Sequence, residues 1–229
     1  ELSFEAAYQA FAEQIAALDA AGVDYILIET IIDIQEMRAA LLAAKAVSKK
    51  PVICQLSFEK DGRTVTGTDP QTAAVILDKL GADIIGANCS LGPDKLFNVA
   101  KEMIAATNKP IIIQPNAGMP VLENGETLFP LSAEDFARET AKFADIGVSY
   151  LGGCCGTTPE HLHALIKELE NKPTVTPPKV KPFTALTCRT GVVYVGDNYA
   201  PVKIGERINP TGRKTLREDI QKGSFVSIK

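Results

Sequence analysis

Gly81-Ala82-Asp83-Ile84-Ile85 joins a helix-ending glycine directly to an apolar run that is typical of a buried strand. The same form occurs earlier as Gly22-Val23-Asp24-Tyr25-Ile26 and later as Gly147-Val148-Ser149-Tyr150-Leu151. A second form, Lys50-Pro51-Val52-Ile53-Cys54-Gln55, returns as Lys109-Pro110-Ile111-Ile112-Ile113-Gln114 and alternates with the first. This alternation predicts five strands in series, at residues 24–30, 51–58, 83–89, 110–116 and 148–152.

Helices are predicted between these strands, because residues that favour helix starts stand at Asp33, Asp69, Ser132 and Thr158. The strands are continuous apolar runs, as expected for a parallel sheet that helices cover. Strand–helix units in series predict an α/β fold of the (β/α)₈ barrel type, and an open doubly wound sheet is the alternative. Five units precede the point near residue 170 where the pattern stops, whereas a barrel needs eight. We therefore expect a barrel truncated to its last five units, with three units upstream of Glu1 and an open five-stranded arc.

A change in composition divides the chain into three parts. Residues 1–170 carry the strand–helix pattern, and residues 171–187 contain four prolines without apolar periodicity, which predicts a semi-rigid linker. Residues 188–229 contain two short β-like runs, a loop at 205–212 and the start of a helix near Lys214. This last part is too short to bury a core of its own, so we expect the chain after Thr187 to pack loosely.

Composition excludes several classes of function. The chain has 229 residues, of which 45% are hydrophobic and 23% charged, and its net charge is −4. It has no cluster of basic residues for nucleic acid, no apolar run long enough for a membrane helix and no signal peptide. Five cysteines without a secretion signal indicate a reducing compartment, the cytoplasm, where clustered cysteines more often serve metal binding or catalysis than disulfides.

The repeats place polar and thiol side chains at the carboxyl ends of the predicted strands. Barrel enzymes build their sites on this face. The side chains placed there are Glu29, Ser57, Asn88, Cys89, Asn116, Cys154 and Cys155. The three thiols suit Zn²⁺ with an open fourth position. Small buried residues or a redox pair remain an alternative for the cysteines, and a phosphate-binding loop is a weaker alternative for residues 152–158.

Two motifs resemble known families. Gly86-Ala87-Asn88-Cys89 with Gly92-Pro93, followed by Gly152-Gly153-Cys154-Cys155-Gly156-Thr157, resembles the zinc motifs of the homocysteine S-methyltransferase family over residues 1 to about 170. The segment Ile204-Gly-Glu-Arg-Ile-Asn-Pro-Thr-Gly212 is similar to the opening of the pterin-binding barrel in cobalamin-dependent methionine synthases. In this resemblance residues 188–229 are the start of a pterin-binding domain, and Asn209 is the candidate cofactor-binding residue.

The resemblance implies a chemistry for the predicted face. Zinc on Cys89, Cys154 and Cys155 would activate homocysteine for methylation, with methylcobalamin and methyltetrahydrofolate bound by other domains of the same polypeptide. Glu29 is the candidate for the amino group of homocysteine. Asn116 is a candidate for the amino acid head group or the zinc shell, and Asn88 and Ser57 are further substrate-binding candidates. A different methyl donor and a non-catalytic zinc-binding barrel remain alternatives, and we expect the chain alone to be poorly soluble and inactive.

Overall fold

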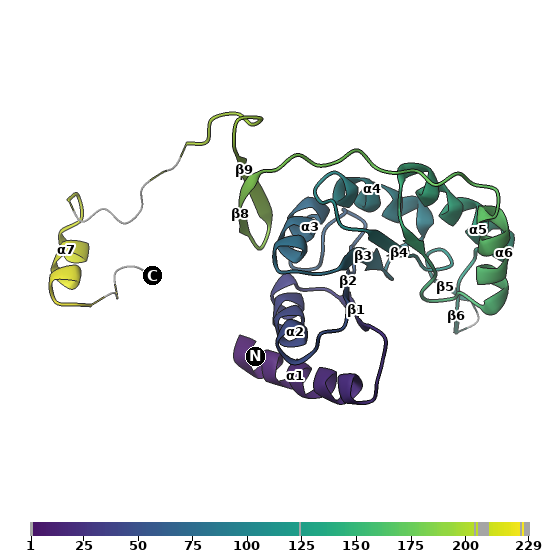
Figure 1. Ribbon diagram of the computed structural model, residues 1–229, viewed down its shortest axis with the longest axis horizontal. Helices are drawn as coiled ribbons and strands as arrows, with labels where there is room; N and C mark the ends of the chain where they lie inside the picture. Colours follow the sequence, from purple (N-terminus) through teal and green to yellow (C-terminus); the bar gives the residue numbers. More distant parts are fainter. Residues whose placement is uncertain (1, 124, 204, 206–210, 225, 227–229) are drawn as a thin grey trace. The chain divides into compact units, whose positions relative to one another are not determined.

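The computed structural model describes residues 2–123, 125–203, 205, 211–224 and 226. Its contacts divide the chain into two compact units, Glu1–Tyr194 and Val195–Lys229. The first unit contains a five-stranded parallel sheet in the order β1-β2-β3-β4-β7 (Figure 1). Its strands are β1 (Ile26–Ile31), β2 (Val52–Leu56), β3 (Ile84–Asn88), β4 (Ile111–Gln114) and β7 (Tyr150–Leu151). All five predicted strands are confirmed.

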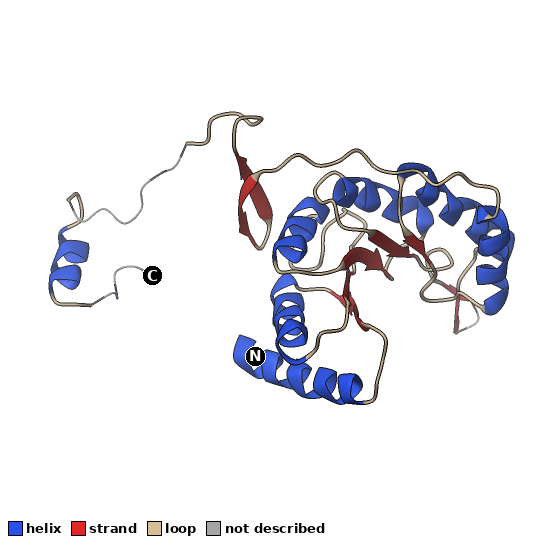
Figure 2. Ribbon diagram, in the orientation of Figure 1, coloured by secondary structure: helices blue, strands red, loops and turns tan. Residues whose placement is uncertain are grey.

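The helices that precede, connect and follow the strands lie along the outer side of the sheet (Figure 2). They are α1 (Phe4–Ala20), α2 (Ile34–Val47), α3 (Pro70–Lys79), α4 (Pro93–Ile104), α5 (Ala133–Ala141), η1 (Lys142–Ile146) and α6 (Pro159–Leu169). Every residue of β2 is buried, because strand neighbours lie on both edges and α2 and α3 contribute to the same core. The predicted parallel α/β sheet covered by helices is therefore present. Strands β1 and β7 form its two edges.

The predicted helix starts have the expected capping contacts. The side chains of Asp33, Asp69 and Ser132 accept hydrogen bonds from the first-turn N–H groups of α2, α3 and α5. Thr158 begins α6 in a reciprocal box, in which the Nδ1 atom of His161 accepts the Thr158 N–H at 3.2 Å. Because each loop before these helices follows a strand, the caps fix where the chain turns back from the carboxyl ends of the strands.

Asp83, in the Gly81-Ala82-Asp83 copy of the first repeat form, has a structural role. Asp83 accepts hydrogen bonds from Lys45 Nζ at 2.7 Å and from the Val52 N–H at 2.8 Å, which ties β3 to α2 and β2. Burial alone would raise the pKa of the Asp83 carboxyl, but these hydrogen bonds outweigh it and hold the pKa below its usual value. They lie at the amino ends of the strands, opposite the predicted site.

The proline-rich segment after α6 is fastened to the first unit. Asn108 donates to the Val180 carbonyl at 3.0 Å and accepts the Val180 N–H at 2.8 Å. A Cβ atom on Gly147 would lie 2.6 Å from Pro177, and Gly147 also has a φ of +89°, so both space and backbone conformation favour glycine there. The segment is therefore a strap along the amino ends of β4 and β7.

The end of the strap differs from the prediction. Residues Thr184–Cys188 form β8, which begins inside the predicted linker, and Gly191–Val195 form β9. Phe183, Ala185, Val192 and Tyr194 pack against the main core, so the chain from Thr187 to Tyr194 belongs to the first unit and is not loosely packed. The expectation of a loose tail from Thr187 onward is corrected for these residues, because alternate side chains of the hairpin are apolar and meet α3.

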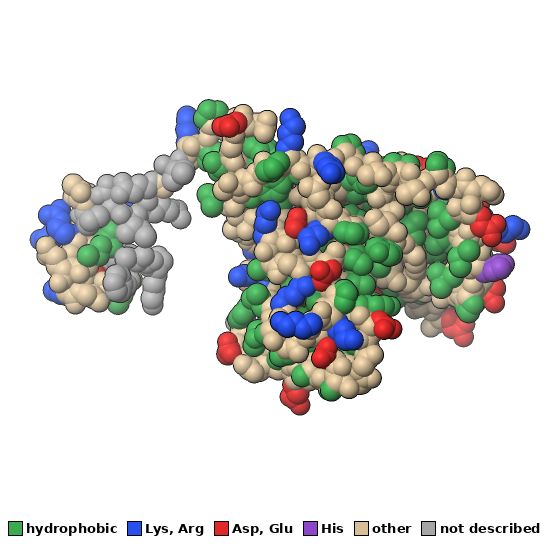
Figure 3. Space-filling model, in the orientation of Figure 1, with side chains coloured by type: hydrophobic (Ala, Val, Ile, Leu, Met, Phe, Trp, Pro, Cys, Tyr) green, Lys and Arg blue, Asp and Glu red, His purple; other side chains and the backbone are tan. Residues whose placement is uncertain are grey.

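The second unit contains helix α7 (Lys214–Gln221), which confirms the helix predicted near Lys214, and Leu216 is buried in it. Residues 201–203 form no strand, and Asn209 lies outside the described residues. The exposed antiparallel pair β5 (Val121–Glu123) and β6 (Glu126–Leu128) was not predicted. Acidic and basic side chains are interleaved over the face of the first unit in Figure 3. Within the described part of the chain, no helix is both long and apolar enough to cross a bilayer.

Candidate metal and substrate site

Three thiols meet at the carboxyl ends of the strands. Cys89 directly follows β3, and Cys154 and Cys155 lie in the loop between β7 and α6. Their three Sγ atoms all lie within 4.8 Å of one another, and Cys89 Sγ is 3.5 Å from Cys155 Sγ. The structure thus brings Cys89 next to two cysteines that lie 65 and 66 positions later in the sequence. It does so because β4 pairs with both β3 and β7, so these two strands are only one position apart in the sheet.

The backbone around the thiols is held by bonds between neighbouring strand ends. Cys89 donates its N–H to the Gln114 carbonyl at 3.1 Å, and Cys154 donates to the Pro115 carbonyl at 2.8 Å. The N–H of Cys155 is bound by the Asn116 side-chain oxygen at 3.0 Å. Gly153 leaves room for the side chain of Thr157, since a Cβ atom there would lie 2.3 Å from it. The main-chain position of each of the three cysteines is therefore fixed by a hydrogen bond.

The thiols disfavour one another's ionisation. Burial, together with the nearby Cys89 and Cys155 thiols, raises the pKa of Cys154 to about 12. The pKa of Cys155 is also raised, first by its hydrogen bond with Cys89 and then by burial. Without a compensating positive charge these two groups stay protonated at neutral pH.

Asn88 and Glu29 stand beside the thiols. The Asn88 Nδ2 atom lies 3.7 Å from Cys154 Sγ and 3.4 Å from a carboxylate oxygen of Glu29. Asn88 is fully buried, whereas Glu29 is exposed on β1. Ser57 is buried and donates its hydroxyl to the Asn88 carbonyl at 3.0 Å. Of the predicted substrate residues, Glu29 thus offers an accessible charged group, and Ser57 and Asn88 are engaged with the protein itself.

Asn116 lies on the other side of the thiols. It is 3% exposed, and its side-chain oxygen is already bonded to the Cys155 N–H. Its own N–H donates to the Leu91 carbonyl at 3.0 Å, which links the loops that carry Cys89 and Cys155. Among the predicted site residues only Asn209 lies outside the described part of the chain.

Sequence reasoning missed two polar features near the site. Thr30 makes two hydrogen bonds with the Asn88 amide, which a strand-end threonine does not reveal by itself. Gln55 donates to Gln114 at 2.5 Å between β2 and β4, and the second Gln55 amide atom is buried without a partner in the structure. The shared glutamine at the end of both copies of the second repeat was a usable signal for this pair.

The two remaining cysteines and the two histidines lie in core, packed or exposed positions. Cys54 is buried in the core, and burial raises the pKa of its thiol to about 12. Cys188 is exposed and lies outside the thiol cluster. His161 packs edge-on against Phe136, and its Nε2 atom is 3.1 Å from the Leu131 carbonyl. His163 is exposed on α6.

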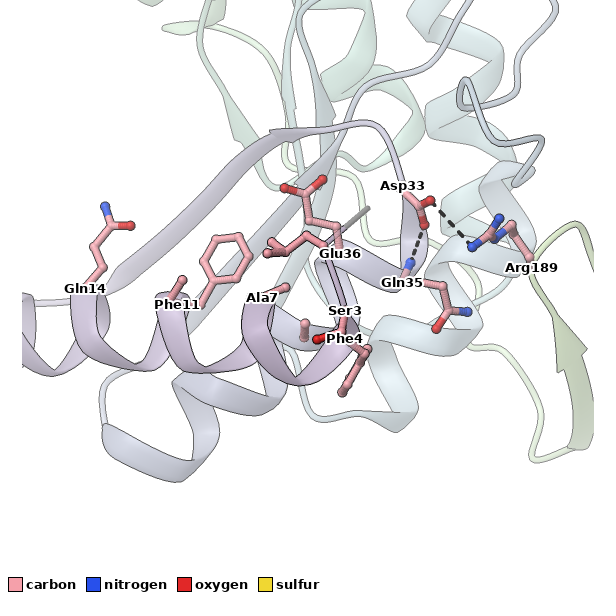
Figure 4. A pocket seen from close by; sticks show the side chains of 12 residues that line it. Ser3, Phe4, Ala7, Phe11, Gln14, Asp33, Gln35, Glu36 and Arg189 are labelled. Carbon is pink, nitrogen blue, oxygen red and sulfur yellow. Dashed lines mark hydrogen bonds and ion pairs between the residues drawn. The ribbon is translucent and has the colours of Figure 1, made fainter.

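A cavity of about 720 Å³ lies away from the thiols, between α1 and the start of α2 (Figure 4). Phe4 and Phe11 line one side, and Asp33 and Arg189 line another. Arg189 Nη2 lies 3.7 Å from Asp33 Oδ2, so the tip of the β8–β9 hairpin forms part of the wall. The chemistry of the thiol cluster, and not the size of this cavity, therefore marks the candidate site.

Fold and site together define a class: an α/β protein whose parallel sheet presents three thiols at the carboxyl ends of its strands. Residues 1–169 match the family described as homocysteine S-methyltransferase. The chain belongs to that family.

Known relatives agree with this assignment. Methionine synthase from Mycobacterium tuberculosis is 31% identical over 221 residues, and that from Mycobacterium leprae is 29% identical over 219 residues. Each match covers 91% of this chain and 18% of the relative, so the chain spans less than a fifth of the length of these proteins.

Solved structures show the same fold. The apo form of the homocysteine methyltransferase MmuM from Escherichia coli has a TM-score of 0.62 at 21% identity, covering 73% of this chain and 59% of MmuM. Its metallated form has a TM-score of 0.57 at 21% identity, covering 69% of this chain and 51% of MmuM.

Proposed function

We propose that this chain activates the thiol of homocysteine for methylation to methionine, with Zn²⁺ held by Cys89, Cys154 and Cys155. The observation that carries the proposal is the cluster of three sulfur atoms within 4.8 Å on the strand ends of a homocysteine S-methyltransferase family member. A free thiol is mostly protonated at neutral pH, and its thiolate is the nucleophile. A site for this reaction must therefore stabilise a thiolate.

The donor set fits zinc. Thiolates are preferred zinc ligands, and three protein ligands leave the fourth position that catalytic zinc sites keep for substrate. Zinc, when bound, supplies the positive charge that keeps a thiol deprotonated near neutral pH. A relative with this fold has been solved in a metallated form, which is consistent with the proposal.

The residues around the thiols have separate roles in this proposal. The exposed Glu29 carboxylate accepts the ammonium group of homocysteine, because it lies beside the cluster and is not buried. Asn116 holds the Cys155 main chain, and Ser57 holds the end of β3 at Asn88. In this arrangement Ser57 and Asn116 orient the cysteines more than they contact substrate.

We further propose that the chain acts within a longer methionine synthase that uses methylcobalamin and methyltetrahydrofolate, because its curated relatives are methionine synthases of much greater length. Residues 1–170 are then the last five units of an eight-stranded homocysteine barrel, 171–187 a linker that ends in β8, and 188–229 the start of a pterin-binding domain with Asn209 toward the cofactor. The first residues of this last part, through Tyr194, pack against the first unit. The five cysteines are unpaired, which supports a reducing compartment such as the cytoplasm.

The test is zinc content and homocysteine methylation in the intact protein. Changing Cys89, Cys154 or Cys155 to Ser should abolish both, because a hydroxyl is a much poorer zinc ligand than a thiolate. Cys188→Ser is the matched control, since Cys188 is exposed and outside the cluster, and it should retain both.

Two results would redirect the proposal. Full zinc and full activity in Cys155→Ser would show that the site is misassigned. Zinc that persists in the wild-type protein without homocysteine binding would indicate a non-catalytic zinc-binding barrel.

A further inference from the structure

Strand β1 contains one extra residue next to the site. Ile28 pairs with Cys54 and Ile31 pairs with Leu56, so three steps along β1 match two steps along β2. The irregularity falls on Glu29 and Thr30. A bulge of this kind redirects the side chains around it, and bulges are over-represented beside active sites.

The bulge is strained. Thr30 has a φ of +61°, which is a rare conformation for a β-branched residue. Such a conformation is unfavourable and persists only where surrounding contacts enforce it. Residues that enforce it therefore determine where the neighbouring Glu29 points.

The amide of Asn88 supplies the enforcing contacts. Its Oδ1 atom accepts the Thr30 N–H at 2.9 Å, and its Nδ2 atom donates to Thr30 Oγ1 at 2.7 Å. Asn88 is itself fixed, because it is fully buried and its carbonyl accepts the Ser57 hydroxyl. The two shortest contacts of the amide thus go to one residue of β1.

The same amide lies between Glu29 and the thiols. Nδ2 is 3.4 Å from Glu29 Oε2 and 3.7 Å from Cys154 Sγ. We propose that Asn88 is a positioning residue: it clamps the strained Thr30 bulge so that Glu29 faces the three thiols, and it does not bind homocysteine itself. This inference rests on the proposed function, since it assigns the ammonium of homocysteine to Glu29.

A double-mutant cycle separates positioning from direct contact. Homocysteine affinity is measured by calorimetry in the zinc-loaded intact protein for Glu29→Gln, Asn88→Ala and the double variant, with zinc content measured for each. Each single variant should bind homocysteine about tenfold more weakly or worse, as loss of a charge-assisted contact predicts. If Asn88 acts through Glu29, adding Asn88→Ala to Glu29→Gln should weaken binding by less than about threefold further.

Thr107→Val is the matched control. Thr107 is buried and bonds to Asp78 and to the Lys109 N–H at the opposite ends of the strands, so its loss should cost stability but not homocysteine affinity. Thr30→Gly gives a second measurement, because glycine adopts positive φ without strain. In the Thr30→Gly background, Asn88→Ala should reduce homocysteine affinity by less than it does in the wild type. If Asn88→Ala alone does not fold, Thr30→Gly is compared with the Thr30→Gly, Asn88→Ala double variant instead.

The outcomes are distinct. Losses that multiply in the double variant, or an undiminished loss in the Thr30→Gly background, would mean that Asn88 contacts substrate and would overturn the inference. Wild-type affinity in a folded Asn88→Ala protein would overturn it too. Failure of the wild-type protein to bind zinc or homocysteine would instead overturn the proposed function.

Discussion

Three residues next to the proposed zinc site have positive φ without being glycine: Thr30 at +61°, Cys89 at +60° and Ser90 at +54°. They lie at the ends of β1 and β3, so backbone strain is concentrated where the site is built. The repeats predicted which residues reach these strand ends, because a parallel sheet brings equivalent positions to one edge. They could not predict the strain, since it depends on hydrogen bonds between residues 58 positions apart in sequence, Thr30 and Asn88.

The same limit applies to the roles of the polar residues. Glu29, Ser57, Asn88 and Asn116 were all placed on the correct edge by the repeat pattern. Sequence alone could not distinguish the exposed Glu29 from the buried Asn88 and Ser57.

Glu29 offers the sharpest test at the scale of single residues. Glu29→Gln keeps the shape of the side chain but removes its charge, so homocysteine binding should weaken by about 1.5–3 kcal/mol. Zinc content should be unchanged, because the three thiols do not depend on this carboxylate. Calorimetric titration with homocysteine and metal analysis of the same sample measure the two quantities.

Glu59→Gln serves as the control, since Glu59 is an exposed carboxylate in the loop after β2 and carries the same charge change. It should leave homocysteine affinity unchanged. Loss of zinc together with substrate in Glu29→Gln would point to a structural role for Glu29.

Among the secondary structure elements, those that bury a face were predictable and those that do not were missed. The five sheet strands are apolar runs, and helices α2, α3, α5 and α6 begin at recognisable caps. The β5–β6 pair is exposed along its whole length, so no burial pattern marks it. Strand β8 is mostly exposed and follows four prolines. For this reason the sequence predicted a linker that extends to Thr187. Contacts of the hairpin with α3, invisible in local sequence, decide its structure.

Gly86 tests the packing of the sheet elements. It pairs with Ile112 across β3 and β4, and a Cβ atom there would lie 1.9 Å from the Ile112 carbonyl oxygen. Gly86→Ala should therefore push the two strands apart and lower the free energy of unfolding by about 2 kcal/mol or more. The midpoint of urea unfolding, or loss of soluble protein, measures this effect.

Gly191→Ala is the matched control, because Gly191 also lies in a strand but nothing lies within 4 Å of its added Cβ atom. Its effect should stay within about 0.5 kcal/mol. Equal stability of Gly86→Ala and wild type would show that β3 and β4 are not as close as described.

At the scale of the molecule, the first unit combines a sheet with two free ends and a strap that crosses it. β1 and β7 each pair on one side only within the described residues. The strap binds the amino ends of β4 and β7, and the hairpin tip reaches Asp33 and the loop before α3, where Thr68 donates to the Arg189 carbonyl at 2.7 Å. The open arc was predictable from counting repeats, whereas the strap was not, because its prolines indicate only extended chain.

The free ends of the sheet predict how the 229-residue chain behaves when expressed alone. An unpaired strand exposes a row of backbone donors and acceptors, and apolar side chains on it favour pairing with another chain. Leu27 on β1 and Tyr150 on β7 are 39% and 49% exposed. We expect the isolated chain to self-associate, and Leu27→Lys with Tyr150→Lys to raise its monomer fraction, because charged side chains disfavour pairing at an edge. Sedimentation velocity at matched protein concentration measures that fraction.

Leu162→Lys with Ile166→Lys separates this edge effect from a general gain in charge. Leu162 and Ile166 are 41% and 62% exposed on helix α6, so these two substitutions add the same two charges without blocking a strand edge. If association runs through β1 and β7, the α6 variant should associate like wild type while the edge variant does not. Equal effects of the two variants would mean that surface hydrophobicity and charge, not the open sheet, control association. A monomeric wild-type chain would show that the two edges of the sheet are protected in solution.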